Sequence, residues 1–212
     1  MINENSTRAE VLEAVKENGL YFKYARDGLH DDKEFVLKLV KINGYSFCYV
    51  SDRLKDDKEV VLTAVKQNGS AIEFSSDRLK DDKEVVLAAV KQNGYSFQYV
   101  SERLKNDKEF VLTAIKEDVY SFKFASKRLK NDKEFVLKAF KEEMTSIQYA
   151  SKEIKSLFGN NYSNVIEVLE RAIASEKLAE KLLKELPEKE EDIKKVKIWL
   201  IKIARKKKIL KR

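Results

Sequence analysis

Side chains that could do nucleophilic, acid–base or zinc chemistry are scarce in this sequence. His30 is its single histidine and Cys48 its single cysteine. A Ser-His-Asp or Cys-His arrangement would have to use His30, which has no motif around it, and a zinc site needs more His and Cys ligands than the chain carries. We expect His30 to be exposed and inert and Cys48 to lie near the surface. The sequence therefore predicts no catalytic residue, no cofactor and no metal site, and the chain is not expected to be an enzyme.

The candidates for binding are surface residues that recur every 25 residues. Tyrosines in one such column suit the recognition of another protein. Arginines and lysines in two further columns could meet an extended acidic partner or a phosphate backbone, but near-neutral charge favours their pairing with Asp and Glu on neighbouring helices. The columns are Leu20, Tyr45, Ser70, Tyr95, Tyr120 and Thr145; Arg53, Arg78, Arg103 and Arg128; and Lys16, Lys41, Lys66, Lys91, Lys116 and Lys141. We predict a protein-binding face that contains Tyr45, Tyr95 and Tyr120 together with the four arginines.

A second candidate is the basic C-terminal end, which holds ten basic and no acidic residues from residue 193 onward. One interpretation is a capping element whose lysines face water, because the end of a repeat stack needs a polar cover. The other is a basic arm for nucleic acid or an anionic membrane surface. The cap is favoured, and both hold if only residues 205–212 project beyond it. The candidate nucleic-acid-binding residues are Lys202, Arg205, Lys206, Lys207, Lys208, Lys211 and Arg212.

One internal repeat must position these columns. The string Asp-Lys-Glu begins at residues 32, 57, 82, 107 and 132, with no insertion or deletion between copies. A gapless period over several copies is typical of a stacked repeat architecture. The predicted units are residues 7–31, 32–56, 57–81, 82–106, 107–131 and 132–156.

The first part of each unit reads as an amphipathic helix, for which residues 82–106 serve as the example. Asp81, with Glu84 three residues later, predicts the N-cap, because its side-chain oxygen can accept free backbone N–H groups. Asn93-Gly94 predicts the end of the helix, because glycine readily takes the left-handed conformation found there. The last two copies carry Asp118-Val119 and Glu143-Met144 instead, so a different junction is expected in them.

The second part of each unit reads as a shorter helix that Ser96 could cap. Phe97, Val100 and Leu104 are spaced at i, i+3 and i+7, which is one face of a helix. Tyr99 lies beside that face, and all its counterparts are aromatic: Tyr24, Tyr49, Phe74, Phe124 and Tyr149. We interpret this aromatic column as core packing between neighbouring units, because buried aromatic rings contribute strongly to cores.

A two-helix unit of this size cannot bury its apolar face alone, so neighbouring units must stack. The expected fold is all-α: a helical-repeat solenoid of six 25-residue two-helix units over residues 1–156. Residues 157–212 leave the period and predict a two-helix C-terminal cap. Six glycines and one proline are too few for the turns of a β-sandwich or barrel.

The repeated strings, seen best in residues 82–94 and 99–106, resemble the DUF4116 family of bacterial repeats of unknown function. One family domain spans about two of these units, so the resemblance covers most of residues 7–156. It implies a bacterial or phage-like source. It implies no catalytic residue, cofactor or partner.

The functional prediction is a non-catalytic protein-interaction solenoid of the scaffold, effector or inhibitor type. The alternative is a protein that binds nucleic acid, or inhibits a nucleic-acid enzyme, through its basic end and its Arg and Lys columns. A lone cysteine and a polar N-terminus favour the cytoplasm. No apolar run approaches the ~20 residues that span a bilayer, so a membrane is not expected as a partner.

Overall fold

The computed structural model describes residues 2–157, 171 and 173–177, and the regular elements within these stretches are all helical. The chain divides into two units, Met1–Lys155 and Ser156–Arg212. In the second unit, the described residues 171 and 173–177 are helical. Within the part of the chain that is described, no helix has the length and apolar character needed to cross a membrane.

Each 25-residue copy contains a ten-residue α-helix, a six-residue 3-10 helix and a four-residue α-helix. The long helices are α1 (Arg8–Glu17), α3 (Lys33–Ile42), α5 (Lys58–Gln67), α7 (Lys83–Gln92), α9 (Lys108–Glu117) and α11 (Lys133–Glu142). The 3-10 helices are η1 (Gly19–Tyr24), η2 (Gly44–Tyr49), η3 (Gly69–Phe74), η4 (Gly94–Tyr99), η5 (Val119–Phe124) and η6 (Met144–Tyr149). The short helices are α2 (Asp27–His30), α4 (Asp52–Lys55), α6 (Asp77–Lys80), α8 (Glu102–Lys105), α10 (Lys127–Lys130) and α12 (Lys152–Lys155).

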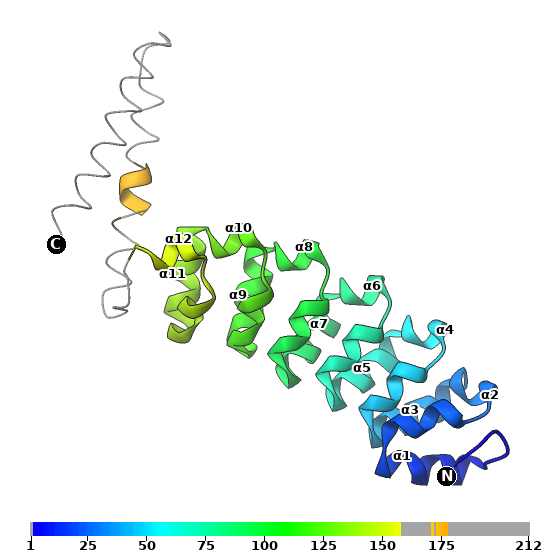
Figure 1. Cartoon of the computed structure of the whole chain (residues 1–212). Helices are drawn as coiled ribbons and strands as arrows, with labels where there is room; N and C mark the ends of the chain where they lie inside the picture. Colours follow the sequence, from blue (N-terminus) through cyan, green and yellow to red (C-terminus); the bar gives the residue numbers. More distant parts are fainter. Residues whose placement is uncertain (1, 158–170, 172, 178–212) are drawn as a thin grey trace. The chain divides into compact units, whose positions relative to one another are not determined.

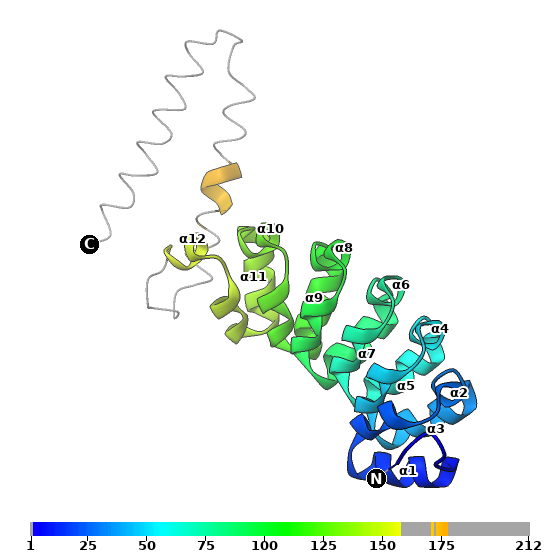
Figure 2. The ribbon, with the colours of Figure 1, turned by 45° about the vertical axis from the view of Figure 1, so that its right-hand side comes forward.

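The copies stack in chain order. Long helices lie side by side in one row, and the short helices follow each other along one edge of that row (Figure 1; Figure 2). Each 3-10 helix packs against the 3-10 helix of the next copy, which forms a further row. The predicted all-α repeat solenoid is confirmed, and the second helical part of each copy is divided into a 3-10 helix and a short α-helix.

The core lies between the rows and repeats with the same period. Phe97, Val100 and Leu104 are 0%, 3% and 0% exposed, which confirms the face predicted for the second part of the repeat. The counterparts of Phe97 in four other copies are likewise fully buried: Phe22, Phe47, Ile72 and Phe122. Burying one such side chain contributes about 1.5–3 kcal/mol relative to leaving it in water. Stability thus comes from each copy covering the apolar side of its neighbour.

The N-caps of the long helices lie one residue later than the sequence suggested. Asp82 caps α7, and its Oδ1 accepts from the backbone N–H groups of Glu84 at 3.0 Å and Val85 at 3.2 Å. The prediction of Asp81 was wrong, because Asp81 sits at the C-terminal end of α6 and faces the next repeat. The equivalent caps in the other copies are Asp32, Asp57, Asp107 and Asp132.

The glycines after the long helices allow close contact between repeats. The prediction of a left-handed stop was wrong, since none of these glycines has a positive φ in the left-handed region. A Cβ on Gly69 would instead lie 2.4 Å from the carbonyl oxygen of Ala89 in the next copy. The expected change of junction in the last copies was also wrong: Asp118, before Val119, keeps the extended backbone of Asn93, with φ −158° against −161°.

Serines start the short helices. Ser101 Oγ accepts from Leu104 N–H at 3.2 Å, and Ser101 N–H donates to the Lys80 carbonyl of the preceding copy at 3.1 Å. Ser96, the predicted cap, instead lies buried inside η4. A backbone bond of the same kind links each of the later copies to the one before it, through Ser51, Ser76, Ser126 and Ser151. The edge formed by the short helices is therefore a continuous line of contacts between repeats.

Candidate protein-binding face

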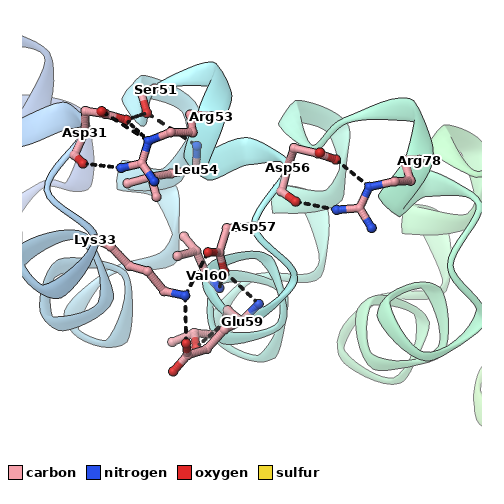
Figure 3. A network of polar contacts seen from close by, with 11 residues as sticks. Asp31, Lys33, Ser51, Arg53, Leu54, Asp56, Asp57, Glu59, Val60 and Arg78 are labelled. Atoms are coloured by element: carbon pink, nitrogen blue, oxygen red, sulfur yellow. Dashed lines mark hydrogen bonds and ion pairs between the residues drawn. The ribbon is translucent and has the colours of Figure 1, made fainter.

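The predicted arginine column lies on the edge of short helices and joins neighbouring copies (Figure 3). Arg53 Nε donates to Asp31 Oδ1 at 3.0 Å, and its Nη2 donates to the Asp31 carbonyl oxygen at 2.7 Å. Ser51 Oγ donates to the same carboxylate. Arg78 with Asp56, Arg103 with Asp81 and Arg128 with Asn106 repeat the arrangement. The interpretation of this column as local pairing with acidic residues is confirmed for Arg53, Arg78 and Arg103, whereas Arg128 bonds the uncharged Asn106. These guanidinium groups hold neighbouring copies together.

These contacts keep the junction carboxylates charged. Hydrogen bonds from Ser51 and Arg53 lower the pKa of Asp31 below its usual value. Arg103 and Ser101 lower the pKa of Asp81 in the same way. At neutral pH, Asp31 and Asp81 therefore each present a full negative charge to a guanidinium group. We name the set of arginines, serines and their Asp or Asn acceptors the Arg junction.

A second contact between copies lies at the start of the long helices (Figure 3). Lys33 Nζ lies 2.7 Å from Asp57 Oδ2 and 2.9 Å from Glu59 Oε2 of the next copy. Burial raises the pKa of Asp57, but the bonds from Lys33 and the Val60 amide outweigh it, and the net pKa is lowered. Equivalent pairs are Arg8–Asp32, Lys58–Asp82, Lys83–Asp107 and Lys108–Asp132. The Asp57 carboxylate thus caps its own helix and also bonds Lys33 of the previous copy. We name these five pairs of a cation and a capping Asp the Lys junction.

The predicted lysine column lies at the last turn of the long helices, where a cation suits the helix dipole. Lys16 pairs with Glu13 at 2.5 Å, and Lys116 pairs with Glu142 of the next copy at 3.2 Å. The side chains of Lys41, Lys66 and Lys91 are exposed. This column is therefore partly paired and partly open to solvent.

The predicted tyrosines lie on the row of 3-10 helices. Tyr45, Tyr95 and Tyr120 are 64%, 41% and 44% exposed. The other exposed large apolar side chains of the described residues are Leu20, Tyr21, Tyr24, Ile42, Phe74 and Met144. All of these belong to 3-10 helices except Ile42, which closely precedes η2. Apolar surface that water would disfavour is therefore gathered on one row of the solenoid.

The aromatic column of Tyr99 contributes to the same row. It was predicted as core packing, and that prediction was wrong: Tyr24 and Phe74 are 44% and 43% exposed, and the other members are half-buried. The missed signal is the free exchange of Tyr and Phe in this column, because a buried ring would rarely tolerate an added hydroxyl without a partner. We name the two columns together the aromatic face: Tyr45, Tyr95, Tyr120, Tyr24, Tyr49, Phe74, Tyr99, Phe124 and Tyr149.

Rings of the aromatic face contact each other across copies four to six. Tyr95 stacks on Tyr120 with 5.1 Å between ring centroids, and its edge meets Phe124 at 5.7 Å. Tyr120 lies 5.9 Å from Tyr149. Lys123 Nζ lies 4.9 Å from the centre of the Tyr95 ring. Such contacts fix ring orientation before any partner arrives, which lowers the entropy lost on binding.

His30 and Cys48 are held in structural contacts. The His30 ring stacks on Phe22 at 4.3 Å, and its two nitrogens face the carbonyl oxygens of Tyr49 at 2.6 Å and Ala25 at 3.0 Å. The expectation that His30 is exposed was wrong, since it is half-buried. Cys48 Sγ donates to the Tyr45 carbonyl at 3.2 Å, and burial raises the pKa of the thiol. The hydrogen bond to the carbonyl and the raised pKa both keep the Cys48 thiol protonated, which makes it a weak nucleophile at neutral pH.

Three further predictions concern residues that the structure describes only in part or not at all. Over the described stretches there is no cluster of three or more His, Cys, Asp or Glu side chains arranged to hold a metal ion. The candidate nucleic-acid-binding residues lie outside the described residues: Lys202, Arg205, Lys206, Lys207, Lys208, Lys211 and Arg212. The predicted two-helix cap of residues 157–212 also falls largely outside them.

Comparison with known proteins gives one match. A family model described as a domain of unknown function (DUF4116) matches residues 10–55, 32–80, 57–105, 82–129 and 107–155. Each match covers about two of the 25-residue copies, and together they cover more than half of the chain. No curated protein and no solved structure matches the chain.

Proposed function

The chain belongs to the DUF4116 family, and from that premise we propose that it is a non-catalytic, protein-binding solenoid that docks its partner on the aromatic face. The role is that of a scaffold, effector or inhibitor. The observation that carries the proposal is the gathering of exposed apolar side chains on the row of 3-10 helices. Exposed apolar patches on soluble proteins mark interaction sites, and tyrosine is enriched among residues that dominate binding energy.

The chemistry of the described residues supports a binding role over catalysis. His30 and Cys48 are engaged by backbone carbonyls, and burial raises the pKa of the thiol. The carboxylates with lowered pKa serve as helix caps and junction acceptors. A lone cysteine held in this way suits a reducing compartment, so the proposal includes a cytoplasmic location.

Nucleic-acid binding is the alternative. It would need cations free to neutralise phosphates. Arg53, Arg78 and Arg103 are already ion-paired with Asp residues in the Arg junction. This pairing argues against phosphate binding by the arginines of the repeats. Exposed Lys41, Lys66 and Lys91 favour it. Electrostatic binding of this kind would weaken steeply as salt rises, whereas an apolar protein interface would respond little.

The test is affinity capture from the source cell with the full chain, followed by identification of the bound material. A variant carrying both Tyr95→Ala and Tyr120→Ala should capture at least about tenfold less partner, as expected for residues that dominate an interface. The matched control carries Lys38→Ala and Thr113→Ala, two exposed positions on the long helices. Undiminished capture by the tyrosine variant, or capture only of nucleic acid, would contradict the proposal.

A further inference from the structure

A column of residues runs along the aromatic face, one 3-10 turn after the column of Tyr95, and all of its members are exposed except the half-buried Cys48. Its members are Lys23, Cys48, Glu73, Gln98, Lys123 and Gln148. A 3-10 helix has three residues per turn, so each member lies on the same side of its helix as the residue three places before it. The charged members come from the first, third and fifth copies and alternate in sign. The members between them are neutral.

Aromatic rings position the two lysines of this column, and Glu73 lies near Tyr99. Lys23 Nζ lies 4.5 Å from the centre of the Tyr24 ring, and Lys123 Nζ lies 4.9 Å from that of Tyr95 and 5.5 Å from that of Phe124. Burial raises the pKa of the Tyr99 phenol, and the neighbouring Glu73 carboxylate raises it further. A cation over a ring face keeps its charge while its motion is restricted.

These three charges have no opposite charge within ion-pair distance among the described residues. The contrast is with the Lys junction, where Lys33 and Lys58 each meet two carboxylates. The chain thus pairs the charges that join its copies and leaves open the ones that lie among its exposed rings. Oriented charges without a counter-charge favour a partner that supplies one.

We infer that the partner segment is an extended peptide whose charges follow the order acidic, basic, acidic along the aromatic face. This rests on the proposed function. Packed helices lie about 10 Å apart, so charges two copies apart are about 20 Å apart. An extended chain rises about 3.3 Å per residue, so the three charges of the peptide are about six residues apart. A uniform polyanion such as a nucleic-acid strand would meet repulsion at Glu73, between the two lysines.

The experiment is selection of a random 20-residue peptide library on the immobilised full chain, in parallel for the natural protein and for Glu73→Lys. Peptides enriched on the natural protein should carry an acidic, a basic and an acidic residue in that order, about six residues apart. Selection on Glu73→Lys should replace the central basic residue by an acidic one. Peptides selected on the natural protein should bind Glu73→Lys about threefold to tenfold more weakly, because an attraction becomes a repulsion.

Two further variants separate this inference from the proposed function. Glu73→Gln removes the charge and keeps the side-chain shape, so it should give an intermediate affinity. The variant with Tyr95→Ala and Tyr120→Ala should lose the selected peptides whatever their charge order. Peptides that need the tyrosines but show no charge order, or the same order on Glu73→Lys, would overturn the inference and leave the proposed function standing. If no enriched peptide depends on the tyrosines, or if oligo(dT) displaces the peptides in a salt-sensitive manner, both are overturned.

Discussion

The junctions and the aromatic face are built from the same 25-residue copy but vary in opposite ways. At the Lys junction, five of the six copies carry the Asp and the Lys of Asp57 and Lys58. On the aromatic face, the position of Tyr95 is filled by Leu, Tyr, Ser or Thr. At these two positions, the copies agree where the side chain must fit the next copy and differ where it is exposed. The variable position of Tyr95 is therefore the one at which different copies could select different parts of a partner.

The reason lies in the reach of each contact. Lys33 bonds Asp57, 24 positions away, and Arg53 bonds Asp31, 22 positions away. Each of these junction residues therefore depends on a partner in a neighbouring copy. A change in one copy would leave its partner in the next copy unmatched. The position of Tyr95 meets fewer such constraints, because Tyr45, Tyr95 and Tyr120 are all exposed. The junction acceptor also changes along the chain, from Asp31, Asp56 and Asp81 to Asn106 and Asn131.

The largest expected effect sharpens the contrast between a buried residue and an exposed one two positions apart. Phe97→Ala should lower the free energy of unfolding by about 3–5 kcal/mol, because Phe97 is 0% exposed and packs on Phe110. Tyr95→Ala should lower it by less than about 1.5 kcal/mol, because Tyr95 loses only its surface ring contacts. Urea unfolding followed by circular dichroism measures both. Equal losses would show that Tyr95 belongs to the core and that the aromatic face is not a free surface.

A smaller effect tests the close contact between copies. Gly69→Ala should destabilise the protein by about 1–3 kcal/mol, since the new Cβ would lie 2.4 Å from the Ala89 carbonyl oxygen, which is backbone and cannot move aside cheaply. Gly28→Ala is the matched control, because Gly28 lies in α2 and a Cβ there meets nothing within 4 Å. That control should stabilise by about 0.5–1 kcal/mol, since alanine suits a helix better than glycine. A neutral Gly69→Ala would mean that the copies separate easily at this point.

Periodicity alone was enough to predict the repeats and their buried columns, because burial follows apolar residues at fixed spacing. The N-cap was misplaced by one residue, since two adjacent acidic residues, Asp81 and Asp82, offer equally good acceptors. Only the neighbouring copy decides between them: Arg103 takes the first and leaves the second to the helix. The sequence of a single helix cannot predict a contact that depends on the next repeat.

The division of the second helix was missed for a related reason. Phe97 and Val100 are three residues apart, a spacing that fits an α-helix and a 3-10 helix alike. Val100 is in fact extended, with φ −70° and ψ 152°, and Ser101 restarts the chain as a helix. The exposure of the Tyr99 column followed from this geometry, because a narrow 3-10 helix turns these rings toward the surface. The residue types of the aromatic face were therefore predictable, but its full extent was not.

Lowering the pH should weaken the Arg junctions whose acceptor is an Asp more than those whose acceptor is an Asn. The Asp acceptors are Asp31, Asp56 and Asp81, and the Asn acceptors are Asn106 and Asn131. The pKa of Asp56 is lowered from 3.8 by Ser76 and Arg78, so this carboxyl binds fewer protons in the folded state than in the unfolded state. Its contribution is present above the unfolded value near 3.8 and is lost as pH falls through the lower folded value. Between pH 5 and pH 3, the amide of Ser76, corrected for intrinsic exchange, should lose about twofold to fivefold more hydrogen-exchange protection than that of Ser126.

The Ser126 amide is the internal control, because its junction uses Asn106, which does not titrate in this range. The Lys junction carries a titrating Asp in both places, Asp57 and Asp107, so its effect cancels in the comparison. Equal loss of protection at the two serines would mean that the charge of Asp56 does not hold its junction.

The smallest expected effect asks whether an Arg junction needs its negative charge at all. Asp81→Asn would convert the third junction into the type found at Asn106, where the amide oxygen accepts from Ser126 at 2.7 Å and from Arg128 at 2.8 Å. Because both hydrogen bonds survive, Tm at pH 7 should fall by less than about 3 °C, as for other exposed ion pairs. Asp81→Ala, which removes the acceptor and leaves Ser101 and Arg103 without it, should lower Tm more than Asp81→Asn, with thermal unfolding as the measurement. If Tm fell equally in Asp81→Asn and Asp81→Ala, the charge of the acceptor and not the geometry of its hydrogen bonds would hold the Arg junctions together. The Asn at the fourth junction would then mark a weaker joint between the copies on either side of it.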